Sequence, residues 1–237
     1  MTTFSQSDFD TFVIESGVIG FFDKPVTLKS GRQSHFYANW RKVSNDVFLI
    51  DQLATFLLEF IHGLESSGRI EHPDTIYGVP EGATKVGIIA QYKYGKASGK
   101  LAPGSHTLSM GRGSPKEHGA PEDRYFVGAP MGKTIIVEDV TTTGGSLLTT
   151  IDTLIASDTP VVAAIGLTNR MEKRDDGKSV ADAIAEKRSS FGPIRYYQMS
   201  SALELLPKIA ARNPIRPEIR DAIESEFKKY GVAELKL

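Results

Sequence analysis

Apolar positions in the first part of the chain predict a small unit built from two helices and a hairpin. Near-helical spacing of apolar residues predicts a short amphipathic helix over residues 5–19, and a second helical stripe covers residues 46–64. Between them, residues 26–41 alternate apolar and polar side chains around a Ser-Gly turn, which is typical of a small antiparallel hairpin. We therefore expect residues 1–66 to form one N-terminal unit. The apolar residues of the first helix are Phe9, Phe12, Val13 and Val18.

Beyond this unit, short apolar segments alternate with helical ones. Strands are predicted for the segments TIYGVP, HTLSM, TIIVEDV and VVAAIGLTNR, and PIRYYQMS could form a further strand. Helices are predicted over residues 83–94 and after the glycine-rich turn that follows TIIVEDV. Because strands alternate with helices, the pattern favours an α/β fold with a parallel sheet flanked by helices. We expect this core to span residues 67–200, with a helical extension over residues 201–237.

One long polar segment interrupts the predicted core. Residues 111–132 are rich in glycine, proline and charged residues and have no apolar periodicity. A segment of this length without structure of its own is unusual in a compact domain, where it is either an active-site flap or disordered. We place the candidate flap at residues 109–132.

Composition narrows the possible classes of function. The 237 residues are 40% hydrophobic and 24% charged with a formal net charge of −1, so nothing favours a nucleic-acid-binding surface, which would be basic. The absence of cysteine excludes disulfide and thiolate chemistry. The N-terminus lacks the pattern of a signal peptide, and no apolar stretch approaches the roughly 20 residues needed to cross a bilayer. We expect a soluble, cytoplasmic protein that contacts no membrane.

The segment TIIVEDVTTTGGS has the pattern of a phosphate site. Glycines let the backbone bring its N–H groups to an anion, hydroxyls add donors, and the start of the following helix favours negative charge. The carboxylates of Glu138 and Asp139 at the strand end would accept hydrogen bonds from sugar hydroxyls. The alternative is a solvated acidic pair before an ordinary threonine-rich helix cap. The candidate loop residues are Val140, Thr141, Thr142, Thr143, Gly144, Gly145 and Ser146.

This segment is similar to the signature that binds phosphoribosyl pyrophosphate (PRPP) in type I phosphoribosyltransferases. That signature is an apolar strand, two acidic residues and a loop of threonine and glycine, as found over residues 137–146. In that family the acidic pair binds the ribose 2′- and 3′-hydroxyls, and the loop holds the 5′-phosphate. The resemblance implies an α/β fold of this type, with a parallel-sheet core flanked by helices, a small N-terminal hood and a long flexible flap.

The flap carries Arg112, Lys116 and His118. Arginine and lysine suit a pyrophosphate, and histidine can donate a proton near neutral pH, although a solvated charged loop is the plain alternative. Their spacing resembles the R-K-x-x-K-x-H-G flap of orotate phosphoribosyltransferases. Gly119 also matches that pattern, whereas Gly113 stands in place of its second basic residue. In that family the flap closes over the active site of the neighbouring subunit, which implies a homodimer.

Two further segments resemble the same family. In TLKSGRQSHFYAN, the resemblance implies that Lys29 contacts PRPP and orotate and that the backbone at Tyr37 and Ala38 borders the orotate ring. Taken alone, Lys29 is one lysine of a hairpin, and most such lysines are solvated. The turn GVPEGAT corresponds to the family's pyrophosphate loop, with Glu81 and Gly82 at its centre, and many members have lysine in place of Gly82.

The fourth predicted strand ends at Arg170, in the family's place for an arginine that reads the pyrimidine. A guanidinium fork suits the carboxylate of orotate. The alternative is a strand-end arginine that pairs with Asp175 or Glu172. By the same resemblance, Thr142 of the loop also borders orotate.

Together the resemblances imply transfer of a phosphoribosyl group from PRPP to N1 of orotate, with orotidine 5′-monophosphate and pyrophosphate as products in pyrimidine biosynthesis. They assign catalysis to the flap residues and Asp139, and they imply Mg²⁺ bound mainly through PRPP rather than by a protein ligand. Alternatives are a type I phosphoribosyltransferase for another nucleobase and a nucleotide-binding regulator with the same fold. The candidate catalytic residues are Arg112, Lys116, His118 and Asp139.

Overall fold

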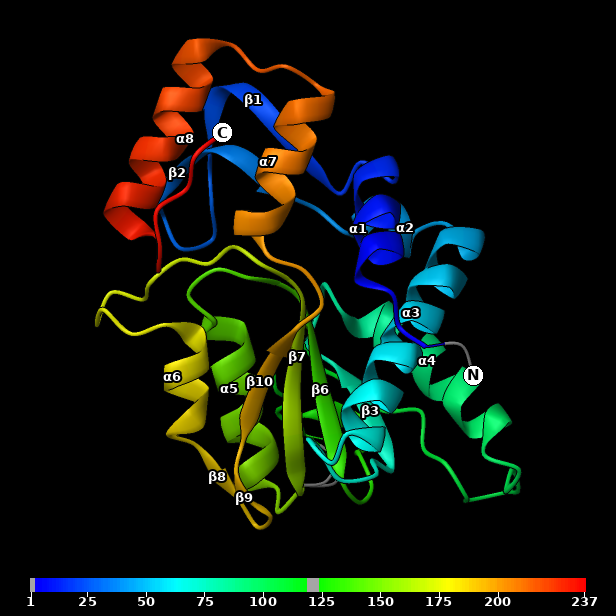
Figure 1. The fold of residues 1–237 in the computed structure, drawn as a ribbon. Coiled ribbons are helices and arrows are strands. Elements are labelled where there is room, and N and C mark those ends of the chain that lie inside the picture. Colours follow the sequence, from blue (N-terminus) through cyan, green and yellow to red (C-terminus); the bar gives the residue numbers. More distant parts are fainter. Residues whose placement is uncertain (1–2, 119–123) are drawn as a thin grey trace.

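The computed structural model describes residues 3–118 and 124–237. Within these ranges, the core is a parallel sheet whose strands lie in the order β10-β7-β6-β3 (Figure 1). The predicted α/β class with a parallel sheet is therefore confirmed, and the segment PIRYYQMS provides the edge strand β10. The strands of this sheet are β3 (Thr75–Gly78), β6 (Thr134–Thr141), β7 (Val161–Asn169) and β10 (Arg195–Gln198).

Helices cover both faces of the sheet (Figure 1). Successive side chains of β6 point to opposite faces, so Ile135 and Val137 join one apolar cluster while Ile136 joins another. Helices α3 and α4 complete the first cluster, and α5 and α6 complete the second. The bounds of these helices are α3 (Val47–Ser66), α4 (Thr84–Ala97), α5 (Gly145–Ala156) and α6 (Val180–Ala185).

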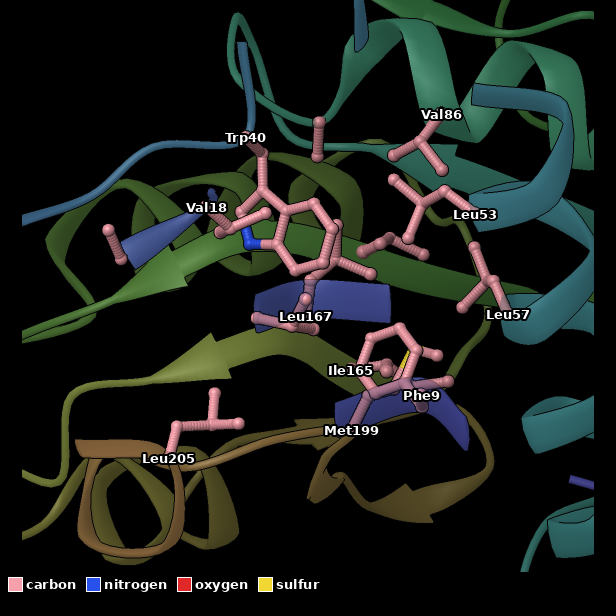
Figure 2. Packing of buried hydrophobic residues seen from close by; sticks show 14 of the residues in the cluster. Phe9, Val18, Trp40, Leu53, Leu57, Val86, Ile165, Leu167, Met199 and Leu205 are labelled. Carbon is pink, nitrogen blue, oxygen red and sulfur yellow. The ribbon is translucent and has the colours of Figure 1, made fainter. Parts of the chain in front are cut away.

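The larger cluster fixes the chain next to the carboxyl ends of the strands. In Figure 2, the rings of Phe9 and Trp40 lie beside Leu53 and Ile165, and the centroids of the two stacked rings are 6.1 Å apart. The indole Nε1 of Trp40 donates a 3.1 Å hydrogen bond to Thr168 Oγ1. Because Trp40 is fully buried and bonded, the residues on either side of it are held in place against β7.

Both ends of the chain pack together. Figure 1 shows the C-terminal helix α8 beside the N-terminal hairpin of β1 and β2, which pair antiparallel. Phe227 of α8 stacks on Phe36 of β2 with 5.9 Å between ring centroids. The C-terminal helices therefore support the hairpin. The bounds are α1 (Gln6–Glu15), β1 (Ile19–Thr27), β2 (Gln33–Ala38), α2 (Arg41–Ser44), α7 (Ala202–Arg212) and α8 (Pro217–Tyr230).

The first helix is shorter than predicted. α1 ends at Glu15, because Gly17 adopts a left-handed backbone conformation with φ of 62°. The chain then enters β1 at Ile19, which the sequence pattern had placed at the end of the helix.

The described part of the flap contains a short pair of strands, where the sequence pattern predicted no regular structure. HTLSM was predicted to be a strand of the central sheet, and that prediction was wrong. β4 (Met110–Gly111) pairs antiparallel with β5 (Phe126–Val127). Beyond this pair, the Arg112 N–H donates to the Tyr125 carbonyl at 2.9 Å, and the Lys116 N–H donates to the Arg124 carbonyl at 2.8 Å. The described flap residues therefore satisfy backbone groups within the flap rather than on the sheet.

Small elements between β7 and β10 had no predicted counterpart. Ser179 caps α6, since its side chain accepts from the Asp182 N–H while the Asp182 side chain accepts from the Ser179 N–H. After this helix, β8 (Arg188–Ser189) and β9 (Gly192–Pro193) pair antiparallel.

Helix α3 is long and apolar enough, by length and composition, to cross a membrane. The expectation that no apolar stretch approaches this length was therefore wrong. In the structure, Leu53, Leu57 and Ile61 of this helix are buried in the larger cluster. The apolar composition of α3 is thus that of a helix packed into a protein core.

Candidate active site

A cleft lies at the carboxyl ends of β6 and β7, where parallel sheets bind ligands. Among the described residues it consists of two adjoining cavities with volumes of about 660 and 420 Å³. Lys29, Glu138 and Ser146 line both cavities. The larger cavity extends along the loop that opens α5, and the smaller one extends toward the hairpin residues Tyr37 and Ala38.

The predicted phosphate loop turns into α5 at Gly144. This residue has φ of 73°, and a Cβ there would lie 2.8 Å from a methyl group of Val180, so a side chain would be both strained and crowded. The N-terminus of α5 therefore faces the larger cavity, where backbone N–H groups and the helix dipole favour an anion. Lys29 adds a cation there, since its Nζ donates to Ser146 Oγ at 2.8 Å.

A partly buried tyrosine lies under this loop. Tyr196 of β10 is hydrogen-bonded to Thr141 Oγ1, the residue that ends β6. A Cβ at Gly166 would lie 2.3 Å from the Tyr196 hydroxyl oxygen, so the glycine makes room for this contact. Burial raises the pKa of Tyr196, which keeps the hydroxyl protonated. Sequence reasoning missed Tyr196, because its partner lies 55 positions away on another strand.

Glu138 and Asp139 lie where β6 reaches the cleft. Glu138 is 6% exposed and lines both cavities, whereas Asp139 is half-buried and lines the smaller one. Burial, and then the neighbouring carboxylate of Asp139, raise the pKa of Glu138 well above its usual value. A buried carboxyl group at this point is suited to receive hydrogen bonds from a bound ligand, because ionisation costs less once donors surround it.

The turn after β3 approaches Asp139 closely. The peptide bond between Pro80 and Glu81 is cis. A Cβ at Gly82 would lie 2.2 Å from Asp139 Oδ2, so a lysine in place of this glycine would have to displace the carboxylate. Lys85, the next lysine along the chain, supplies no cation to the cleft in place of a lysine at Gly82, since its Nζ donates to Asn45 Oδ1 and it is not among the residues that line the cleft.

Arg170 reaches the wall of the smaller cavity, and its guanidinium has several partners within the protein. The residue is 1% exposed, and Cζ lies 3.8 Å from the centroid of the Phe36 ring. Its Nε donates to Glu172 at 2.7 Å, and Nη2 donates to Glu226 and to Ser34 Oγ at 3.0 Å each. The predicted contact between this guanidinium and orotate stays a prediction, since Arg170 also lines the smaller cavity. The alternative, a pair with Glu172, is the one observed, and Glu226 of α8 is a further partner that sequence reasoning missed.

The flap brings part of its predicted set to this cleft. Arg112 and Gly113 line the larger cavity, and Arg112 Nε donates to the Phe126 carbonyl at 3.2 Å. Lys116 and His118 are exposed and do not line the cleft. Gly119, the last residue of the flap pattern, lies outside the described residues.

Metal ligands do not gather in the described part of the chain, where no group of three or more His, Cys, Asp or Glu residues could hold a metal ion. The smaller cavity does present the carboxylates of Glu81, Glu138 and Asp139. Carboxylates are hard oxygen donors of the kind that Mg²⁺ prefers, and Mg²⁺ commonly keeps several ligands from water or substrate. These carboxylates are therefore the described side chains of the cleft that could contact a magnesium ion.

The parallel sheet, the acidic pair and the loop that opens α5 define the class of the protein as a type I phosphoribosyltransferase fold. The fold resembles that of orotate phosphoribosyltransferase from Francisella tularensis, with a TM-score of 0.64 and 20% identity over 94% of this chain and 99% of that chain. The orotate phosphoribosyltransferase of Bradyrhizobium diazoefficiens is 32% identical over 160 residues, which cover 64% of this chain and 76% of that protein. The chain belongs to the orotate phosphoribosyltransferase family.

The resemblance extends over nearly the whole chain in another relative. The orotate phosphoribosyltransferase of Agathobacter rectalis is 29% identical over 233 residues, covering 95% of this chain and 97% of that protein. No family model matches the sequence.

Proposed function

We propose that this protein transfers the phosphoribosyl group of PRPP to N1 of orotate, releasing pyrophosphate and forming orotidine 5′-monophosphate. The observation that carries the proposal is the cleft itself, in which an anion-binding loop, an acidic pair and a hairpin lysine meet at the end of β6. Membership of the orotate phosphoribosyltransferase family supports orotate as the acceptor.

The donor would lie along the two cavities. Its 5′-phosphate would accept hydrogen bonds from the backbone N–H groups and hydroxyls of the loop at residues 141–146. Its ribose hydroxyls would donate to Glu138 and Asp139, the carboxylates at the end of β6. Lys29, which lines both cavities, would then lie between the phosphate end and the acceptor.

The chemistry requires charge to be stabilised more than it requires a proton to be moved. Breaking the C1–O bond of PRPP builds positive charge on the ribose and negative charge on the departing pyrophosphate. Fixed cations next to the pyrophosphate stabilise that transition state because they need no reorganisation as the charge develops. We assign this role to Arg112 and Lys116, with His118 as a hydrogen-bond donor to the same group.

Magnesium would be the cofactor, held mainly by oxygen atoms of PRPP. When bound, it supplies positive charge to the pyrophosphate as it leaves. The carboxylates of Glu138 and Asp139 would hold the ribose end of the same assembly in place, and the flap would exclude water that would otherwise hydrolyse PRPP.

Orotate would bind against the hairpin side of the smaller cavity, where Tyr37 and Ala38 form the wall and Thr142 faces them across the cavity lining. Lys29 would pair with its carboxylate. Arg170, which lines the same cavity, would add a second cation on this side, and its contacts to Ser34 and to the Phe36 carbonyl hold the strand that leads into this wall.

We further propose that the protein is a cytoplasmic homodimer in which each flap covers the cleft of the neighbouring subunit. Arg112 and Gly113 line the cleft of their own subunit, whereas Lys116 and His118 are exposed outside it, and the exposure of these two residues supports the arrangement. It would place both side chains near the pyrophosphate of the partner's substrate.

A substrate panel tests the proposed function. Purified protein with PRPP and Mg²⁺ is expected to consume orotate, followed as loss of orotate absorbance, and to leave uracil, adenine and hypoxanthine unchanged. Turnover of another base in preference to orotate would reassign the acceptor. Absence of turnover with every base would reject the phosphoribosyltransferase activity.

A further inference from the structure

Arg41 is a cation in the cleft that no motif indicated. It begins α2, directly after the buried Trp40, and it is exposed. It lines the smaller cavity together with Glu81, Gly82 and Asp139. Its backbone N–H donates to the Asn39 side chain at 3.0 Å, and this hydrogen bond stabilises the turn that leads from the hairpin into α2. Arg41 is thus held at the cavity by its neighbours on both sides.

The other cations that line the smaller cavity, Lys29 and Arg170, already have side-chain partners in the protein. Lys29 donates to Ser146 at the phosphate end, and Arg170 is paired with Glu172 and Glu226. Within residues 3–118 and 124–237, the guanidinium of Arg41 has no hydrogen bond or ion pair. A guanidinium beside three carboxylates without a fixed partner is available to a ligand that carries negative charge.

The position of α2 places Arg41 on one side of the cavity. Asn45, at the end of α2, accepts a hydrogen bond from Lys85 near the start of α4. α4 follows directly after the turn of Glu81 and Gly82, so this contact ties α2 to that turn. Arg41 therefore lines the cavity that this turn also lines, and it does not line the larger cavity along the loop that opens α5.

We propose that Arg41 binds the diphosphate group of the phosphoribosyl donor. The inference rests on the proposed function and adds a residue to it. Gly82 carries no side chain, because the carboxylate of Asp139 occupies that space, and Gly113 on the flap side carries none either. Arg41 supplies the positive charge that this wall otherwise lacks, and its planar fork matches two oxygen atoms of a phosphate group.

Binding of three ligands to wild type and variants tests whether Arg41 binds the diphosphate group, the ribose phosphate or orotate. Pyrophosphate with Mg²⁺, ribose 5-phosphate and orotate are titrated separately by calorimetry into wild type, Arg41→Ala, Arg41→Lys and Lys42→Ala. Lys42 is the matched control, an adjacent exposed lysine that does not line the cleft. Steady-state KM for PRPP and for orotate is measured on the same proteins.

Arg41→Ala is expected to weaken pyrophosphate binding and to raise the KM for PRPP by roughly tenfold or more, as loss of a charged hydrogen-bond donor does. Arg41→Lys should recover part of this loss. Ribose 5-phosphate and orotate should bind all variants as they bind wild type, and Lys42→Ala should match wild type throughout.

Unchanged pyrophosphate binding by Arg41→Ala would overturn the inference while leaving an active wild type, and hence the proposed function, intact. A loss confined to orotate would also overturn it, because Arg41 would then read the acceptor. Wild type that binds neither pyrophosphate nor PRPP would instead reject the proposed function and the inference with it.

Discussion

At the scale of single residues, two neighbouring carboxyl groups have different surroundings. Glu138 is almost completely buried at the end of β6, whereas Asp139 is half-buried against the backbone of Gly82. Burial raises the pKa of Glu138, so in the empty cleft it keeps its proton to a higher pH than a free glutamic acid does. Asp139 also receives a 2.8 Å hydrogen bond from the Val140 N–H, which holds its carboxylate in place.

We predict that binding of PRPP releases a proton from Glu138. Ribose hydroxyls donate to an ionised carboxylate, so the bound donor favours ionisation and lowers the raised pKa of this group. PRPP affinity should therefore increase as pH rises from the usual value for glutamic acid toward the raised pKa. Titration in buffers of different ionisation enthalpy measures the number of protons released. Equal proton release by wild type and Glu138→Gln would contradict this assignment.

Arg170 is another residue whose surroundings explain its role, because it is buried between two carboxylates. Its guanidinium neutralises Glu172 and Glu226 in the interior, and burial raises the pKa of Glu226 in spite of that pairing. The sequence could predict one of the two partners of Arg170, since Glu172 lies two positions away. The sequence could not predict the other partner, Glu226, because Glu226 reaches Arg170 only when α8 packs on the hairpin.

Arg170→Ala is expected to lower the free energy of unfolding by about 3 kcal/mol, because it leaves the largely buried Glu226 without a counter-ion and Glu172 paired with Arg32 alone. Denaturant unfolding followed by circular dichroism measures the change. Arg216→Ala is the control, since Arg216 pairs with Asp23 at the surface and its loss should cost less than about 1 kcal/mol. Similar losses for both variants would mean that the buried network does not act as described.

At the scale of elements, sequence patterns predicted correctly those helices and strands that depend on neighbouring residues. The path from β6 through the loop into α5 could be predicted, because alternating apolar residues, glycines and a helical stripe follow one another in sequence. The prediction that HTLSM forms a strand of the central sheet was wrong, because strand pairing depends on partners far along the chain. The last residue of this segment, Met110, pairs with Val127 inside the flap, and periodicity does not encode that choice.

The flap is the element on which the proposed chemistry can be tested. Lys116→Ala is expected to lower kcat roughly 100-fold or more, because a cation that stabilises developing charge acts mainly in the transition state. The affinity for orotate should change little. Lys100→Ala, an exposed lysine that does not line the cleft, is a suitable control. An unchanged turnover number in the Lys116 variant would remove the flap from the mechanism.

At the scale of the whole molecule, the two ends of the chain form one support for the acceptor side of the cleft. The N-terminal hairpin supplies Lys29, Tyr37 and Ala38, and α8 packs against the outside of the same hairpin. Sequence patterns predicted helices beyond residue 201, and these are confirmed as α7 and α8. Their location could not be predicted, since the pairing of Phe227 with Phe36 spans most of the chain.

Mixing two inactive variants tests the proposed exchange of flaps between subunits. Lys116→Ala removes the flap cation, and Asp139→Asn damages the cleft. In a mixed dimer, one active site would combine an intact flap with an intact cleft, so an equal mixture after unfolding and refolding should recover about a quarter of wild-type activity. Each variant refolded alone provides the baseline. A mixture no more active than that baseline would indicate that each flap serves its own subunit.

The most direct test of the account is a calorimetric titration of the folded protein with PRPP in the presence of Mg²⁺. We predict binding at one site per chain, and strong weakening by Gly144→Val, because a side chain at that left-handed position distorts the loop and meets Val180. Folded wild-type protein that takes up no PRPP under these conditions would contradict the assignment of the cleft.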